Sequence, residues 1–194
     1  MSFPNQLSLL RILLSPVFLF LFLSENLLYK KISLIVFFIA VFTDWYDGWH
    51  ARKFGEISKA GIFLDPLADK ILTSSAFIGF FILGIMPLWM VILIVIRDIV
   101  ITVLRSMQEY KGKTMKTSFI AKTKTFIQMT YIFLIVILVS LLSFNISPEF
   151  SSLINNFLVS ETNYMLMLIV TLITVATGVF YFFEKDKASI KTLS

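Results

Sequence analysis

Long hydrophobic segments separated by short polar ones dominate the chain. Each hydrophobic segment is close to the length at which an α-helix crosses a bilayer, roughly 20 residues. The pattern predicts six membrane-spanning helices, at residues 7–23, 32–50, 60–83, 88–105, 125–142 and 164–183. We therefore predict an all-α polytopic membrane protein in which residues 1–194 form a single domain.

Composition supports this class. Hydrophobic residues make up 58% of the 194 residues, and 21 of them are phenylalanine, which we interpret as lipid-facing bulk. Such a composition is typical of membrane proteins rather than soluble domains. The lipid bilayer is thus the expected environment, and we expect no nucleic-acid partner. Cysteine is absent, which excludes disulfides and thiolate metal sites.

Lysine and arginine are distributed unequally between the two sides of the predicted bundle. The connections that follow spans one, three and five contain only Lys30 and Lys31. The termini and the other connections are much more basic, and the connection between spans four and five has five lysines up to Lys124. The positive-inside rule places both termini on the cytoplasmic side, and we expect a bacterial-type inner membrane.

Four aspartates stand out in this apolar chain. Asp44 and Asp47 are spaced i, i+3, and Asp65 and Asp69 are spaced i, i+4, so each pair shares one helix face. A turn near residue 56 would bring all four carboxylates to similar depths on two antiparallel helices. Four such groups cannot stay ionised together without cations, and divalent metal ions prefer oxygen ligands. The alternative is a purely structural pair of ion-paired helices, but Arg52 is the only cation inside the motif that could balance its four acids. We favour a cytoplasm-facing, metal-dependent active site just inside the bilayer.

The same segment resembles a family pattern. The CDP-alcohol phosphatidyltransferases carry Asp-x2-Asp-Gly-x2-Ala-Arg-x8-Gly-x3-Asp-x3-Asp. Every fixed position is filled here, by Asp44, Asp47, Gly48, Ala51, Arg52, Gly61, Asp65 and Asp69. The resemblance implies a transferase that uses CDP-diacylglycerol as donor and releases CMP.

The resemblance also implies roles within the site. Two divalent cations, Mg²⁺ or Mn²⁺, would be held by the four aspartates, and Asp69 would also act as the general base. Asp44 and Asp47 would contribute to CDP-diacylglycerol binding. Gly48 has no side chain and lets a nucleotide approach the helix, unless it is a helix-packing glycine. Arg52 offers a planar fork to the diphosphate, unless it extends to the membrane interface.

Two residues before the motif have an open interpretation. Arg11 could extend to the membrane interface. Alternatively, Asn5 and Arg11 line the headgroup end of the site, with Asn5 in the CDP-diacylglycerol site, because similar N-terminal segments occur in the family.

Cations in the second half of the chain indicate the acceptor. We expect Arg97, Arg105, Lys122 and Lys124 to bind a phosphate on the acceptor alcohol, such as glycerol 3-phosphate, although inositol phosphate also fits. Arg97 and Arg105, eight residues apart, share a helix face, and intramembrane arginine is usually functional. Alternatively, Arg97 has only a structural role as the ion-pair partner of Asp98. Against this, side chains that are neighbours in sequence point about 100° apart on a helix.

Two stretches narrow the acceptor through the family resemblance. The family members that make phosphatidylglycerophosphate carry an Arg-Asp/Glu…Arg stretch and a Gly-Lys-x-Lys-Thr-x-x-Gln stretch. This chain has Arg97-Asp98 followed by Arg105, and a second stretch that runs from Ala121 to Gln128 with alanine in place of glycine. The resemblance implies glycerol 3-phosphate as acceptor and a homodimer. A cardiolipin synthase with a lipid acceptor is the alternative; a cation or proton transporter is disfavoured because the acids cluster in one hairpin.

Overall fold

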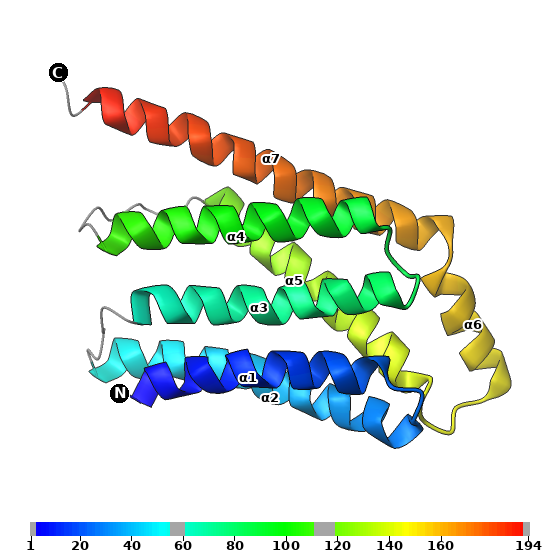
Figure 1. The fold of residues 1–194 in the computed structure, drawn as a ribbon. Helices are drawn as coiled ribbons and strands as arrows, with labels where there is room; N and C mark the ends of the chain where they lie inside the picture. Colours follow the sequence, from blue (N-terminus) through cyan, green and yellow to red (C-terminus); the bar gives the residue numbers. More distant parts are fainter. Residues whose placement is uncertain (1–2, 55–60, 111–118, 192–194) are drawn as a thin grey trace.

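The computed structural model describes residues 3–54, 61–110 and 119–191 (Figure 1). In these residues it contains helices and no strands, which confirms the all-α prediction. The helices are α1 (Phe3–Leu23), α2 (Leu27–Phe54), α3 (Gly61–Ile82), α4 (Leu88–Tyr110), α5 (Phe119–Leu141), α6 (Pro148–Leu158) and α7 (Glu161–Lys191).

Each predicted span corresponds to a long helix, but several helices extend beyond the hydrophobic segment. The prediction that Lys122 and Lys124 lie in a connection is wrong, because α5 begins at Phe119 and contains both. Lysine and threonine are compatible with a helical backbone. The drop in hydropathy before residue 125 therefore marks where the apolar surface of α5 begins, whereas the helix itself begins earlier. This extension places the lysines on a rigid element.

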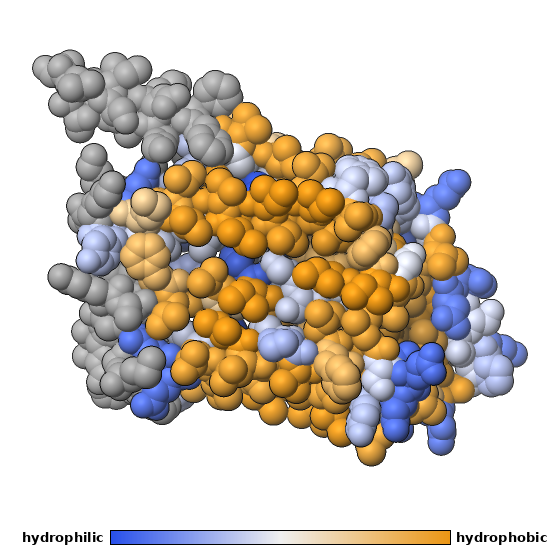
Figure 2. Space-filling view, in the orientation of Figure 1, coloured by the Kyte–Doolittle hydropathy of each residue, from blue (hydrophilic) through white to orange (hydrophobic). Residues whose placement is uncertain are grey.

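The chain has the character of an integral membrane protein. Helices α1, α5 and α7 each contain a window long and apolar enough to cross a bilayer. Helices α2, α3 and α4 and the first turns of α5 carry the charged residues of the predicted site. Figure 2 shows a hydrophobic surface across the face of the bundle, with hydrophilic residues gathered at the end where α6 lies.

The arrangement brings the functional helices together. Helix α1 packs against both α2 and α3, and α4 packs against α3 and α7. Helix α5 crosses behind them and contacts α2, α3 and α7 (Figure 1). Helix α1 begins and α7 ends at the same end of the bundle, as the predicted even number of spans requires. The predicted turn near residue 56 lies outside the described residues.

The short helix α6 was not predicted, because its 11 residues are too few to span a bilayer. The signals for it are local. Ser147 caps its N-terminus by accepting a hydrogen bond from the Phe150 amide at 3.3 Å, and Pro148 occupies the first turn. Helix α6 therefore forms the second part of the connection between α5 and α7.

One buried asparagine ties the helices at that end together. Asn163 at the start of α7 is fully buried. Its amide nitrogen donates to the Leu158 carbonyl at 2.7 Å, and its amide oxygen accepts from the Tyr131 hydroxyl at 3.1 Å. The Asn163 side chain thus links α5, α6 and α7 by hydrogen bonds. These bonds specify how the three helices align, which the pattern of apolar residues does not specify.

The interpretation of phenylalanine as lipid-facing bulk is wrong for the centre of the bundle. Phe18, Phe22, Phe37 and Phe80 are buried. The ring centroids of Phe18 and Phe22 are 5.2 Å apart, and those of Phe18 and Phe37 are 5.1 Å apart. Such ring contacts stabilise helix packing beyond their buried area. Hydropathy alone does not distinguish these rings from exposed ones such as Phe126.

A tight turn at Gly84 connects α3 and α4. Gly84 has φ +72°, a conformation in which glycine carries no Cβ penalty. The Ile85 amide donates to the Phe80 carbonyl and the Gly84 amide to the Phe81 carbonyl, both at 2.9 Å. This helix-ending motif folds α4 back along α3, and it brings Asp98 of α4 close to Lys70 of α3.

Candidate active site

Helix α1 joins the two helices that carry the aspartates. Asn5, Ser8 and Arg11 follow one another at a spacing of three residues, and all three side chains are buried. Arg11 Nη1 pairs with Asp44 of α2, and Ser8 Oγ donates a hydrogen bond to Asp65 of α3. The N-terminal half of α1 therefore belongs to the aspartate site.

The structure decides between the two interpretations of Arg11. An arginine that extended to the membrane interface would be exposed, but the Arg11 side chain has no exposed surface and points inward to Asp44. The first interpretation is therefore wrong. The partner Asp44 keeps 47% of its side chain exposed, so this carboxylate is open to further ligands.

The structure describes the side chains of three of the four predicted metal ligands. The described side chains of Asp44, Asp65 and Asp69 contact a guanidinium, a hydroxyl and an ammonium group. A carboxylate has several lone pairs, so one such partner leaves room for a metal ion. The donor set is all oxygen, which fits Mg²⁺ or Mn²⁺.

The convergence of four carboxylates stays a prediction. Asp47, Gly48 and Arg52 lie on α2, but the structure does not describe the side chains of Asp47 and Arg52. Among the residues that are described, no group of three or more acidic, histidine or cysteine side chains is close enough together to hold a metal ion.

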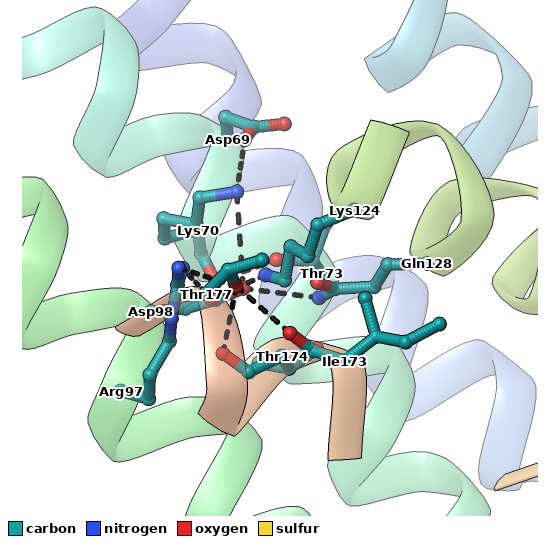
Figure 3. A network of polar contacts seen from close by, with 10 residues as sticks. All are labelled: Asp69, Lys70, Thr73, Arg97, Asp98, Lys124, Gln128, Ile173, Thr174 and Thr177. Carbon is teal, nitrogen blue, oxygen red and sulfur yellow. Dashed lines mark hydrogen bonds and ion pairs between the residues drawn. The ribbon is translucent and has the colours of Figure 1, made fainter. Parts of the chain in front are cut away.

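A second polar cluster surrounds Asp98 on α4 (Figure 3). The Asp98 side chain is only 2% exposed. Its Oδ1 accepts from Lys124 Nζ at 2.5 Å and from Arg97 Nη1 at 2.9 Å, and its Oδ2 accepts from Gln128 Nε2 at 3.0 Å. We call these residues, together with Lys70, the Asp98 cluster.

Lys70 connects the Asp98 cluster to the aspartate site. Its Nζ lies 2.8 Å from Asp69 Oδ2 and 3.9 Å from Asp98 Oδ2. Figure 3 shows Lys70 between the two carboxylates. Only the Lys70 side chain therefore separates Asp69, the predicted base, from Asp98 and its other cations.

Helix α7 holds Arg97 from the other side. Arg97 Nη2 donates to Thr177 Oγ1 at 2.8 Å. A Cβ atom at the neighbouring Gly178 would lie 2.9 Å from Arg97 Cγ, closer than real contacts allow. The absence of a side chain at Gly178 thus lets Arg97 lie flat against α7.

The structure brings together two of the four predicted acceptor-binding cations. Arg97 and Lys124 meet at Asp98. Lys122 is exposed on α5, and Arg105 lies two turns further along α4. The argument from helical spacing against an Arg97–Asp98 pair is wrong, because the long arginine side chain bends back to the neighbouring carboxylate.

Sequence reasoning missed several residues of these clusters. The sequence alone indicates no role for Ser8, Lys70 or Thr177, and it indicates Gln128 only as part of a motif. Lys70 directly follows Asp69, and Ser8 is one turn before Arg11, so helical spacing was an available signal for both. Thr177 lies 80 residues from Arg97, and no local pattern indicates that contact.

Known proteins resemble the chain over this whole region. A family model described as CDP-alcohol phosphatidyltransferase matches residues 1–180. A Bacillus subtilis protein named CDP-diacylglycerol–glycerol-3-phosphate 3-phosphatidyltransferase is 36% identical over 140 residues, which cover 66% of this chain and 72% of the relative. A protein of the same name from Wigglesworthia glossinidia brevipalpis is 35% identical over 159 residues, covering 76% of this chain and 87% of the relative.

The motif of Asp44 to Asp69, the all-helical fold and these similarities agree. A match over residues 1–180 includes the aspartate site, the Asp98 cluster and most of α7. The chain belongs to the CDP-alcohol phosphatidyltransferase family.

Proposed function

We propose that the chain transfers the phosphatidyl group from CDP-diacylglycerol to sn-glycerol 3-phosphate, and so forms phosphatidylglycerophosphate. The primary hydroxyl oxygen of the acceptor forms a bond to the lipid-side phosphorus of the diphosphate. The bond from that phosphorus to the bridging oxygen breaks, and CMP leaves. The names of the relatives support this reaction, and the Asp98 cluster beside Asp69 is the observation that carries it.

The aspartate site would bind the donor. Asn5, Asp44, Asp47, Gly48 and Arg52 form the proposed CDP-diacylglycerol site. Two divalent cations, Mg²⁺ or Mn²⁺, would be held by Asp44, Asp47, Asp65 and Asp69, and would neutralise the diphosphate charge when bound. Arg11 and Ser8 orient Asp44 and Asp65, which supports a preformed arrangement of these ligands.

The Asp98 cluster would bind the acceptor. Lys70, Arg97 and Lys124 surround Asp98, and their side chains are only 14%, 16% and 3% exposed. Even with Asp69 included, the cations outnumber the carboxylates. Excess buried positive charge is costly unless an anion neutralises it. The phosphate of glycerol 3-phosphate supplies that anion, and Arg105 and Lys122 keep their proposed role as further phosphate contacts.

Asp69 is the proposed base. It would take the proton from the attacking hydroxyl as the new bond to phosphorus forms. Lys70 fixes the Asp69 carboxylate at 2.8 Å and also faces the acceptor site. The base and the acceptor phosphate would thus be held at a defined separation.

We also propose how the enzyme sits in the membrane. The basic end of the bundle, with both termini, faces the cytoplasm of a bacterial cell, where CMP and glycerol 3-phosphate are soluble. The acyl chains of the donor remain in the bilayer. The proposed assembly is a homodimer, an expectation that rests on the family.

The most direct test of the activity is an assay on purified, detergent-solubilised protein. CDP-diacylglycerol would be offered with glycerol 3-phosphate, inositol phosphate, serine or phosphatidylglycerol, and CMP and lipid products would be measured. We expect phosphatidylglycerophosphate from glycerol 3-phosphate alone. Cardiolipin from phosphatidylglycerol would instead identify the lipid-acceptor enzyme.

Loss of the base should stop turnover without loss of the fold. In Asp69→Asn we expect kcat to fall by at least 100-fold, while binding of both substrates persists. Glu149→Gln on α6, an exposed acid at the opposite end of the bundle, is the matched control.

Chelation with EDTA should abolish wild-type activity, and added Mg²⁺ or Mn²⁺ should restore it. Full activity after exhaustive chelation would refute the metal site.

Orientation can be measured with single cysteines, because the chain has none of its own. Ser152 on α6 and Glu109 near the end of α4 are both exposed. In intact cells, a membrane-impermeant maleimide should label Ser152→Cys at once and Glu109→Cys only after permeabilisation. The reverse pattern would contradict the proposed orientation. Equal labelling would show that the two sites lie on the same side, which would contradict a single membrane crossing by α5 between them.

A further inference from the structure

Gln128 is the one member of the Asp98 cluster without an assigned role. It lies on α5, one turn after Lys124, and is 2% exposed. Its Nε2 donates to Asp98 Oδ2 at 3.0 Å. An ionised carboxylate only accepts hydrogen bonds, so the amide nitrogen must face Asp98 and the amide oxygen must face away from it. Asp98 therefore fixes the orientation of the Gln128 side chain.

The oriented oxygen has no partner in the described part of the protein. Gln128 Oε1 is buried and accepts no hydrogen bond from any described residue. Buried polar atoms of native proteins are nearly always satisfied. Lys124 and Arg97, the nearby cations, each donate to the other side of the carboxylate, at Asp98 Oδ1, and neither makes a hydrogen bond to Gln128 Oε1. Gln128 Oε1 therefore needs a donor from outside the described part of the protein.

The chemistry of the proposed acceptor supplies such a donor. An ionised phosphate carries only acceptor oxygens, which suit Lys70, Arg97 and Lys124 and do not suit Gln128 Oε1. Glycerol 3-phosphate also carries two hydroxyls. One is the nucleophile, and the other, on the middle carbon next to the phosphate-bearing carbon, takes no part in the reaction and is free to donate.

We propose that Gln128 Oε1 accepts a hydrogen bond from this non-reacting hydroxyl, so that Gln128 determines specificity for a vicinal diol phosphate. The inference rests on the proposed function, since it assumes that the acceptor phosphate lies in the Asp98 cluster. Asp98 then has two tasks, because it orients both the phosphate-binding cations and the hydroxyl-binding amide. A site of this kind rejects an analogue that lacks the hydroxyl, because the buried amide oxygen is left unpaired.

A substrate with the hydroxyl removed gives the test. 3-Hydroxypropyl phosphate keeps the nucleophile and the phosphate of glycerol 3-phosphate but lacks the middle hydroxyl. We compare kcat/KM for the two acceptors in wild type and in Gln128→Met, which keeps the side-chain length. The control is Thr130→Val, on the same helix, where an exposed hydroxyl bonds only the Phe126 carbonyl.

The ratio of the two kcat/KM values is the readout. We expect wild type and Thr130→Val to prefer glycerol 3-phosphate by roughly 3- to 10-fold, the effect of one neutral hydrogen bond. Gln128→Met should bring the ratio close to one. If this variant is inactive, Gln128→Asn decides the question, because its shorter side chain withdraws the oxygen and should also lower the ratio.

Other outcomes overturn the inference. A Gln128 variant that slows both acceptors equally and keeps the wild-type ratio has only a structural role. A wild-type enzyme that uses both acceptors equally well does not recognise the middle hydroxyl. If wild type uses neither acceptor but transfers to another alcohol, the proposed function itself fails, and that result is distinct from a loss of discrimination.

Discussion

The rest of the bundle depends on the ion pairs of one buried carboxylate, that of Asp98. It receives charged groups from α3, α4 and α5, and through Arg97 it is connected to Thr177 on α7. Apolar packing against lipid gives little preference for one helix register over another. Removing one partner of a buried ion pair costs about 3–5 kcal/mol. Asp98 therefore specifies how four helices meet, and it also holds Lys70, Arg97 and Lys124 beside the aspartate site.

The two polar clusters are separated by one lysine. Asp44 and Asp65 are held by residues of α1, whereas Asp69 is held by Lys70, which also reaches towards Asp98. This arrangement suits a reaction with two very different substrates. The donor diphosphate would lie against the aspartates, the acceptor phosphate against the cations, and the proposed base between them. The turn at Gly84 and the crossing of α5 behind α3 make the arrangement possible.

The sequence predicted the features that depend on local spacing. Apolar segments predicted the long helices, and the Asp44 to Asp69 pattern predicted the family, because both signals lie within a few helical turns. Features that depend on packing were not predictable. Hydropathy is the same for Phe22, which is buried, and Phe126, which is exposed. The Arg97–Thr177 contact joins distant segments, and α6 is too short to produce a spanning signal. The role of Lys124 as a phosphate ligand stays a prediction, and its place inside a helix became clear only from the fold.

The central claim is that the acceptor phosphate lies among the cations of the Asp98 cluster. Solid-state NMR measures this directly, from the dipolar coupling between the phosphorus of bound glycerol 3-phosphate and ¹⁵N-labelled lysine Nζ atoms in bilayers. The account predicts strong coupling that weakens when Lys124 is replaced by glutamine, and that is unchanged when the distant Lys31 is replaced instead. Bound, turnover-competent glycerol 3-phosphate with no coupling to any lysine Nζ would contradict it.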